Sequence, residues 1–117
     1  MKKLFVLVFA LTIGAAQAQS KVSPTFEKEG NLVKATYYYD DGTVHQQGFF
    51  KDNKLTGMWT KFDKKGNKIA IGFYKEGKKT GKWFHWNRNQ LKEVTYKNSA
   101  IEKVSIWTDA TTVASNK

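Results

Sequence analysis

Apolar and polar residues alternate through most of residues 31–107, and this pattern predicts β-strands. In residues 32–39, for example, Val33, Ala35 and Tyr37 fall on one face of an extended chain, with polar residues between them. The β-branched and aromatic residues that dominate these stretches favour strands. No segment after the first 18 residues shows a helical period, so the sequence predicts an all-β fold.

The pattern repeats with a period of 24 residues. Residues 49–51 (Phe-Phe-Lys) align with residues 73–75 (Phe-Tyr-Lys), and residues 56–59 (Thr-Gly-Met-Trp) align with residues 80–83 (Thr-Gly-Lys-Trp). Trp107 follows Trp83 at the same interval and indicates a third, degenerate copy, so we expect Trp59, Trp83 and Trp107 to form one column across the sheet. Repeats of this kind bury their apolar surface by stacking on their neighbours, which predicts a repeat architecture.

Two glycines stand inside the predicted strands. Gly48 and Gly72 directly precede the aromatic pair of their copies. Glycine weakens a strand, and it recurs where another group must approach the backbone closely. We expect the rings of Trp59 and Trp83 to be those groups.

About seven short strands joined by turns of about four to six residues are predicted, each antiparallel to the one before. The prediction is an antiparallel β-meander of stacked hairpins forming a single open, twisted sheet, with free edges near Val33 and Ile106. Residues 19–30 contain the only proline and are expected to form a loose lead-in. Residues 108–117 are small, polar and aperiodic, and we expect a disordered tail.

The first 18 residues have the pattern of a cleavable bacterial signal peptide. Two lysines precede an apolar run over residues 4–16, which ends in Ala16-Gln17-Ala18, a sequence that a signal peptidase accepts. The run is shorter than the roughly 20 residues that span a bilayer. The chain contains no cysteine, which excludes both a lipoprotein anchor and disulfides. We therefore expect a periplasmic or secreted protein with no transmembrane span after cleavage.

The chain is strongly basic. Its formal net charge is +10, and loss of Lys2 and Lys3 with the signal peptide would leave +8. Such a charge favours acidic partners, among them anionic lipids and envelope glycans. Nucleic acid is disfavoured because an exported protein rarely meets it. The same charge could also serve only to keep an exposed sheet soluble.

The sequence offers little catalytic chemistry. Residues 72–78 fit the spacing of a phosphate-binding loop, but Lys79 stands where that loop needs serine or threonine, and no helix follows. His45 and His85 are the only histidines, and they occupy non-equivalent repeat positions, too few and too dispersed for a zinc site. We expect no metal, no cofactor and no enzymatic activity.

Residues 74–83, Tyr-Lys-Glu-Gly-Lys-Lys-Thr-Gly-Lys-Trp, and their copy at residues 50–59 resemble the variant MORN repeat. This repeat occurs in short exported bacterial proteins and in the family labelled YwqK-type antitoxins. The resemblance covers about residues 31–107. It implies stacked β-hairpins in one elongated, twisted sheet, and contacts with proteins or acidic membranes in place of catalysis.

Two functions stay open at this stage. The first is a protein-interaction scaffold that uses an aromatic sheet face or an open edge, with self-association included. Its candidate residues are Trp59, Trp83, Phe62, Trp86 and Tyr38. The second is an electrostatic binder of acidic envelope lipid or glycan through lysine-rich turns. Its candidate residues are Lys75, Lys78, Lys79, Lys82, Lys51 and Lys54.

Overall fold

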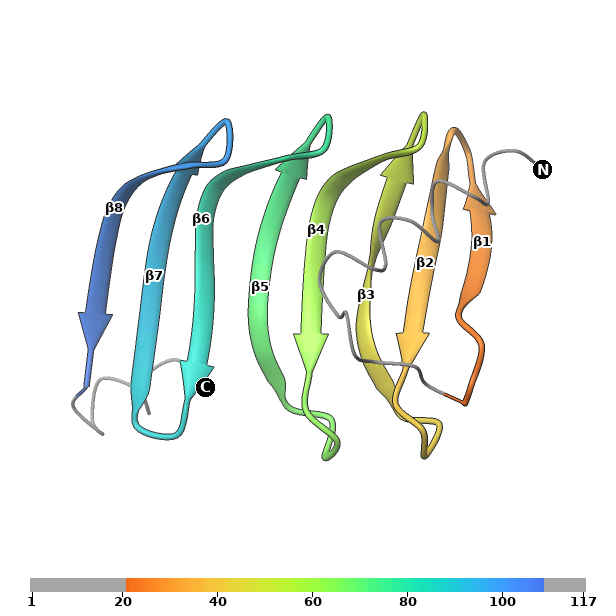
Figure 1. Cartoon of the computed structure of the whole chain (residues 1–117), viewed down its shortest axis with the longest axis horizontal. Helices are drawn as coiled ribbons and strands as arrows, with labels where there is room; N and C mark the ends of the chain where they lie inside the picture. The colour runs from red at the N-terminus through yellow and green to blue at the C-terminus, as the bar shows by residue number, and fades with distance from the viewer. Residues whose placement is uncertain (1–20, 109–117) are drawn as a thin grey trace.

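The computed structural model describes residues 21–108, which form one antiparallel sheet of eight strands (Figure 1). The strands are β1 (Thr25–Glu29), β2 (Leu32–Tyr38), β3 (Val44–Lys51), β4 (Lys54–Phe62), β5 (Lys68–Lys75), β6 (Lys78–Asn87), β7 (Gln90–Lys97) and β8 (Ala100–Trp107). Each strand pairs with the next one in the sequence. The predicted all-β meander in one open sheet is therefore confirmed. The signal peptide predicted for residues 1–18 and all but the first residue of the predicted tail lie outside the described residues.

Strand β1 lies inside the segment that was predicted to be a loose lead-in. It pairs along its whole length with β2. Three of its five residues are charged and Phe26 is its only large apolar residue, so the sequence showed too little alternation to reveal it. The first edge of the described sheet is consequently β1, and the edge predicted near Val33 is wrong. The opposite end is β8, where an edge was expected near Ile106.

The turns at the two ends of the strands differ. The turns after β3, β5 and β7 are tight. In the first and last of these, Asp52, Asn53, Asn98 and Ser99 adopt positive φ angles of 50°, 67°, 50° and 68°. The turns after β2 and β4 are longer and are closed by aspartates. In the latter, the backbone N–H groups of Lys65 and Asn67 both donate to Asp63 Oδ1 at 2.9 Å. Because the strands alternate in direction, the tight turns share one end of the sheet and the aspartate turns share the other (Figure 1).

The two strand glycines provide room for two tryptophans, as predicted. A Cβ atom placed on Gly48 would lie 1.9 Å from Cδ2 of Trp59, and one on Gly72 would lie 2.2 Å from Cδ2 of Trp83. No side chain larger than hydrogen fits at that distance. Each indole N–H donates to a backbone carbonyl at 3.1 Å, that of Phe49 for Trp59 and that of Phe73 for Trp83. Each ring therefore lies directly on the preceding strand of its own hairpin.

The third copy of the repeat does not preserve this arrangement. Trp83 lies opposite Val94, whereas Trp107 lies opposite Leu91, three residues away on the same strand. Because successive residues of a strand point to opposite faces, Trp107 lies on the other face of the sheet from Trp83. The expectation that Trp59, Trp83 and Trp107 form one column is therefore wrong for Trp107. Tyr96 occupies the position where the first two copies have glycine, so an indole could not lie there.

Cross-strand pairing divides the side chains into two faces. The aromatic face carries the buried cluster of Ala35, Tyr37, Phe50 and Trp59, and continues to Tyr74, Trp83 and Tyr96. The back face carries the side chains of the intervening positions. The core of this single-layer protein is thus the aromatic face itself.

Candidate functional site

The five aromatic residues proposed as partner contacts are divided between the two faces. Trp59 and Trp83 belong to the aromatic face, whereas the register places Tyr38, Phe62 and Trp86 on the back face. The structure therefore does not bring these five side chains into one surface.

Trp59 and Trp83 are part of the core. Each is only 8% exposed. Tyr74 lies between them and meets both rings edge to face, with centroid distances of 6.2 Å to Trp59 and 5.1 Å to Trp83. Phe50 packs against Trp59 in the same way at 5.3 Å. These rings stabilise the sheet, and little of the surface of the two indoles is accessible to a protein partner.

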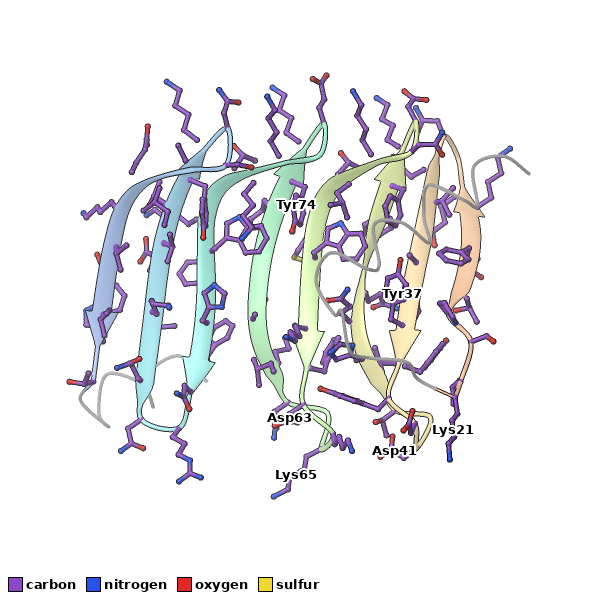
Figure 2. The ribbon with its side chains drawn as sticks, viewed as in Figure 1. Lys21, Tyr37, Asp41, Asp63, Lys65 and Tyr74 are labelled. Carbon is purple, nitrogen blue, oxygen red and sulfur yellow. The ribbon has the colours of Figure 1, made fainter. Side chains whose placement is uncertain are left out.

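The six candidate lysines fall into three groups. Lys79 lies over the aromatic face, with Nζ 4.9 Å from the ring centroid of Trp83 and 5.0 Å from that of Tyr96. Lys82 lies on the back face, where Nζ is 3.4 Å from Glu93 Oε2. The other four flank the tight turns after β3 and β5: Lys51, Lys54, Lys75 and Lys78. We call this end of the sheet the lysine edge; Figure 2 shows long side chains ending in nitrogen along it.

Hydrogen bonds fix neighbouring turns of the lysine edge to one another. The N–H of Gly77 donates to the carbonyl of Leu55 at 2.9 Å, and the N–H of Ser99 donates to the carbonyl of Lys79 at 2.9 Å. The N–H of Lys79 in turn donates to Ser99 Oγ at 3.0 Å. A hollow of about 400 Å³ lies among these turns, lined by Lys54, Lys75, Glu76, Lys78, Lys79, Thr80 and Asn98. The lysine edge is thus a fixed basic ridge.

The apolar residues most accessible to solvent gather on β8. Six large apolar side chains are exposed in the described part of the chain, and four of them belong to this strand. They are Ile101 (60% exposed), Val104 (48%), Ile106 (52%) and Trp107 (37%). An end strand with apolar side chains can pair with a further strand. An edge was expected here from the sequence, but the exposure of these side chains was not predicted.

The two histidines lie in different surroundings, and both have a lowered pKa. The pKa of His85 is lowered mainly by burial and then by Lys92, Lys79 and Lys61. The pKa of His45 is lowered by burial and by Lys61, and its ring lies 4.6 Å from that of Tyr39. Within residues 21–108 no three histidine, cysteine or acidic side chains are grouped so that they could bind a metal ion. The same residues contain no helix long and apolar enough to cross a membrane.

Comparisons with known proteins give no family. No protein-family model matches the chain, and neither a curated protein nor a solved structure shows significant similarity to it.

Proposed function

We propose that the protein is a non-catalytic exported scaffold that binds a protein partner through the open edge at β8. The concentration of exposed apolar side chains on this strand carries the proposal. Within residues 21–108, β8 is hydrogen-bonded only to β7. An extended segment of a partner could add to the sheet there, with backbone hydrogen bonds giving affinity and alternate side chains giving selectivity.

The pairing of β8 with β7 indicates which partner segment would fit, because it fixes the face to which each β8 side chain points. Val104 lies opposite Val94 and Ile106 lies opposite Lys92, which places both on the aromatic face. Trp107 lies on the back face. A segment with β-branched residues at alternate positions would therefore continue the aromatic face, and an apolar residue between them would meet Trp107. The resemblance of the repeat to the variant MORN repeat also supports a role in contacts.

The lysine edge favours a second function, the binding of acidic envelope lipid or glycan. Successive tight turns are two strands apart, so they repeat about every 9 to 10 Å along the edge. Lysines fixed at this spacing would meet successive charges of a polyanion or of an anionic surface. Only Glu76 supplies a carboxylate to the hollow between the turns.

Retention experiments with the immobilised mature protein distinguish the two functions. Envelope extract is passed over residues 19–117 at low and at high salt, and retained proteins, lipids and glycans are identified. The edge variant is Val104→Lys with Ile106→Lys. The matched control is Met58→Lys with Phe73→Lys, which adds the same two charges at exposed apolar positions of β4 and β5. We expect one protein to be retained at both salt concentrations and lost only with the edge variant.

The opposite result would favour the lysine edge. Retention of acidic lipid or glycan only at low salt, abolished by replacing Lys51, Lys54, Lys75 and Lys78 with serine, would overturn the β8 proposal. Salt sensitivity is the discriminating property because exposed charges are screened within about 10 Å at 0.1 M salt.

A further inference from the structure

A row of side chains crosses the aromatic face below the tryptophans. It contains one residue from each of six neighbouring strands: Tyr37, Gln46, Lys61, Ala70, His85 and Lys92. Directly opposed residues of antiparallel strands point to the same face, with Cβ atoms about 4.5 to 5.5 Å apart. The row therefore places an amide, two ammonium groups and an imidazole on one surface, with the methyl group of Ala70 between Lys61 and His85.

The small side chain of Ala70 leaves a hollow in this surface. It encloses about 300 Å³, and its lining includes Trp59, Tyr74, Trp83, Lys61, Lys79 and His85. This volume lies at the lower end of the range found for small-molecule sites. Aromatic rings and basic groups therefore line the hollow together.

The charge of the hollow is unbalanced. Its lining contains two lysines and a histidine but no aspartate or glutamate. Lys61, Lys79 and Lys92 all act on His85 strongly enough to help lower its pKa, so four basic groups share this surface. Lys79 is also fixed over two rings, which reduces the entropy that it would lose on binding an anion.

One polar group in the lining, the hydroxyl of Tyr37, lacks a hydrogen-bond partner in the protein. This hydroxyl is buried. Burial raises the pKa of Tyr37 to about 12, so the phenol stays protonated at neutral pH. A buried hydroxyl without a partner costs free energy that a ligand oxygen or a water molecule would recover.

The positions of this row vary between copies of the repeat, whereas the structural positions around it do not. Tyr37, Lys61 and His85 occupy the same repeat position, yet they are three different residue types. The glycine and tryptophan positions, by contrast, are identical in the first two copies. Packing therefore fixes the tryptophan row and leaves the row beneath it free to carry binding chemistry.

We propose that this hollow binds a sugar acid of monosaccharide size, with its carboxylate at Lys61, Lys79 and His85 and its ring against the aromatic lining. Lysine and histidine would donate to the carboxylate, and the amide of Gln46 would bond a ring hydroxyl. An apolar sugar face suits the half-buried ring of Tyr74, as in other sites with apolar walls and a few polar groups. This site is separate from the β8 edge and does not depend on the partner proposed there.

The test is a titration of the mature protein with D-glucuronate, followed by calorimetry and by the imidazole proton signals of His85. D-Glucose serves as the neutral analogue, and acetate serves as the carboxylate without a ring. We expect glucuronate to bind at least about tenfold more tightly than either, and to raise the pKa of His85, because a nearby anion favours the imidazolium. Lys61→Gln should weaken binding about tenfold, as loss of a charged hydrogen bond does.

Lys68→Gln is the matched control, since it removes the same charge from an exposed position on the back face. It should leave the affinity for glucuronate unchanged. The proposal is overturned if glucuronate does not bind, if glucose or acetate binds equally well, or if Lys68→Gln weakens binding as much as Lys61→Gln. Both lysines are exposed, so both variants are expected to fold, and circular dichroism checks this.

Discussion

The first two copies of the repeat and the third copy continue the same antiparallel meander but build different surfaces. In the first two, a glycine admits an indole, and Trp59 and Trp83 become buried. In the third, Tyr96 replaces the glycine, and Trp107 lies on the other face at 37% exposure. The comparison shows that a tryptophan in this sheet is buried only where the adjacent strand lacks a side chain beneath it.

This difference also explains the edge at β8. In the first two copies, the strand that follows the tryptophan strand pairs with it, and its side chains pack beside those of the tryptophan strand and continue the aromatic face. Within the described residues, no strand follows β8, and its apolar residues stay exposed. Within residues 21–108 the degenerate copy therefore forms the last strand of the sheet, and its outer side is where a partner strand would pair.

The largest effect is expected from Gly48→Val. The new side chain would occupy the position of the Trp59 ring, so the ring must leave the core. Expelling a tryptophan costs about 3 to 5 kcal/mol, a large part of the roughly 5 to 15 kcal/mol that stabilises a domain. Denaturant unfolding followed by tryptophan fluorescence measures this loss of free energy of unfolding.

Ala100→Val is the control in the third copy, where the position equivalent to Gly48 already carries Tyr96. Ala100 is exposed at the start of β8, and we expect this substitution to change the free energy of unfolding of the protein by less than about 0.5 kcal/mol. Equal effects of the two substitutions would show that the glycine–tryptophan contact does not distinguish the copies.

A smaller effect is expected from Trp83→Phe. This change leaves a cavity and removes a donor that bonds the carbonyls of Phe73 at 3.1 Å and Thr80 at 3.2 Å. We expect a loss of about 2 to 3 kcal/mol in the free energy of unfolding. Trp107→Phe, at an exposed site, should cost less than about 1 kcal/mol. A larger loss for Trp107→Phe would contradict the assignment of Trp107 to the outside of the core.

The sequence predicted those parts of the fold that depend on local pattern. The alternation gave the all-β meander, and the repeated Gly48 and Gly72 gave the two tryptophan contacts. It did not give β1, whose charged residues conceal a strand that only pairing with β2 stabilises. It also misplaced Trp107, because constant spacing in sequence does not determine the face once a copy has slipped in register.

The candidate sites were predicted less well, for a similar reason. Spacing grouped Lys75, Lys78, Lys79 and Lys82 into one turn, but only the first two flank it. Lys79 and Lys82 belong to β6 and point to opposite faces, because their separation is odd. The row from Tyr37 to Lys92 could be found only when cross-strand pairing was known, since its members are distant in the sequence.

The stability of the second copy should depend on pH, because His85 lies beside Trp83 there. Burial and nearby lysines lower its pKa in the folded protein below the ordinary value of 6.5. As pH falls through about 6.5, the unfolded chain takes up a proton first, so the free energy of unfolding decreases. The decrease ends once the pH is below the folded pKa.

Unfolding of the native protein, His85→Gln and His45→Gln at a series of pH values between 7.5 and 4.5, about the range in which histidine titrates, measures this contribution. The pKa of His45 is lowered in the same direction, so each single variant should retain part of the decrease. The double variant should lose most of it. An unchanged pH profile in the double variant would assign the effect to the carboxylates.

The smallest effect is expected from Tyr37→Phe. The hydroxyl of Tyr37 has no protein partner, so its removal breaks no hydrogen bond and should leave the free energy of unfolding unchanged or raise it by up to about 1 kcal/mol. Tyr39→Phe is the matched comparison, because the hydroxyl of Tyr39 donates to the carbonyl of Phe62 at 2.6 Å. That variant should lose about 1 kcal/mol. If Tyr37→Phe destabilises the protein as much as Tyr39→Phe does, a bound water already satisfies the Tyr37 hydroxyl. If Tyr37→Phe leaves the free energy of unfolding unchanged, the hydroxyl is available to a ligand.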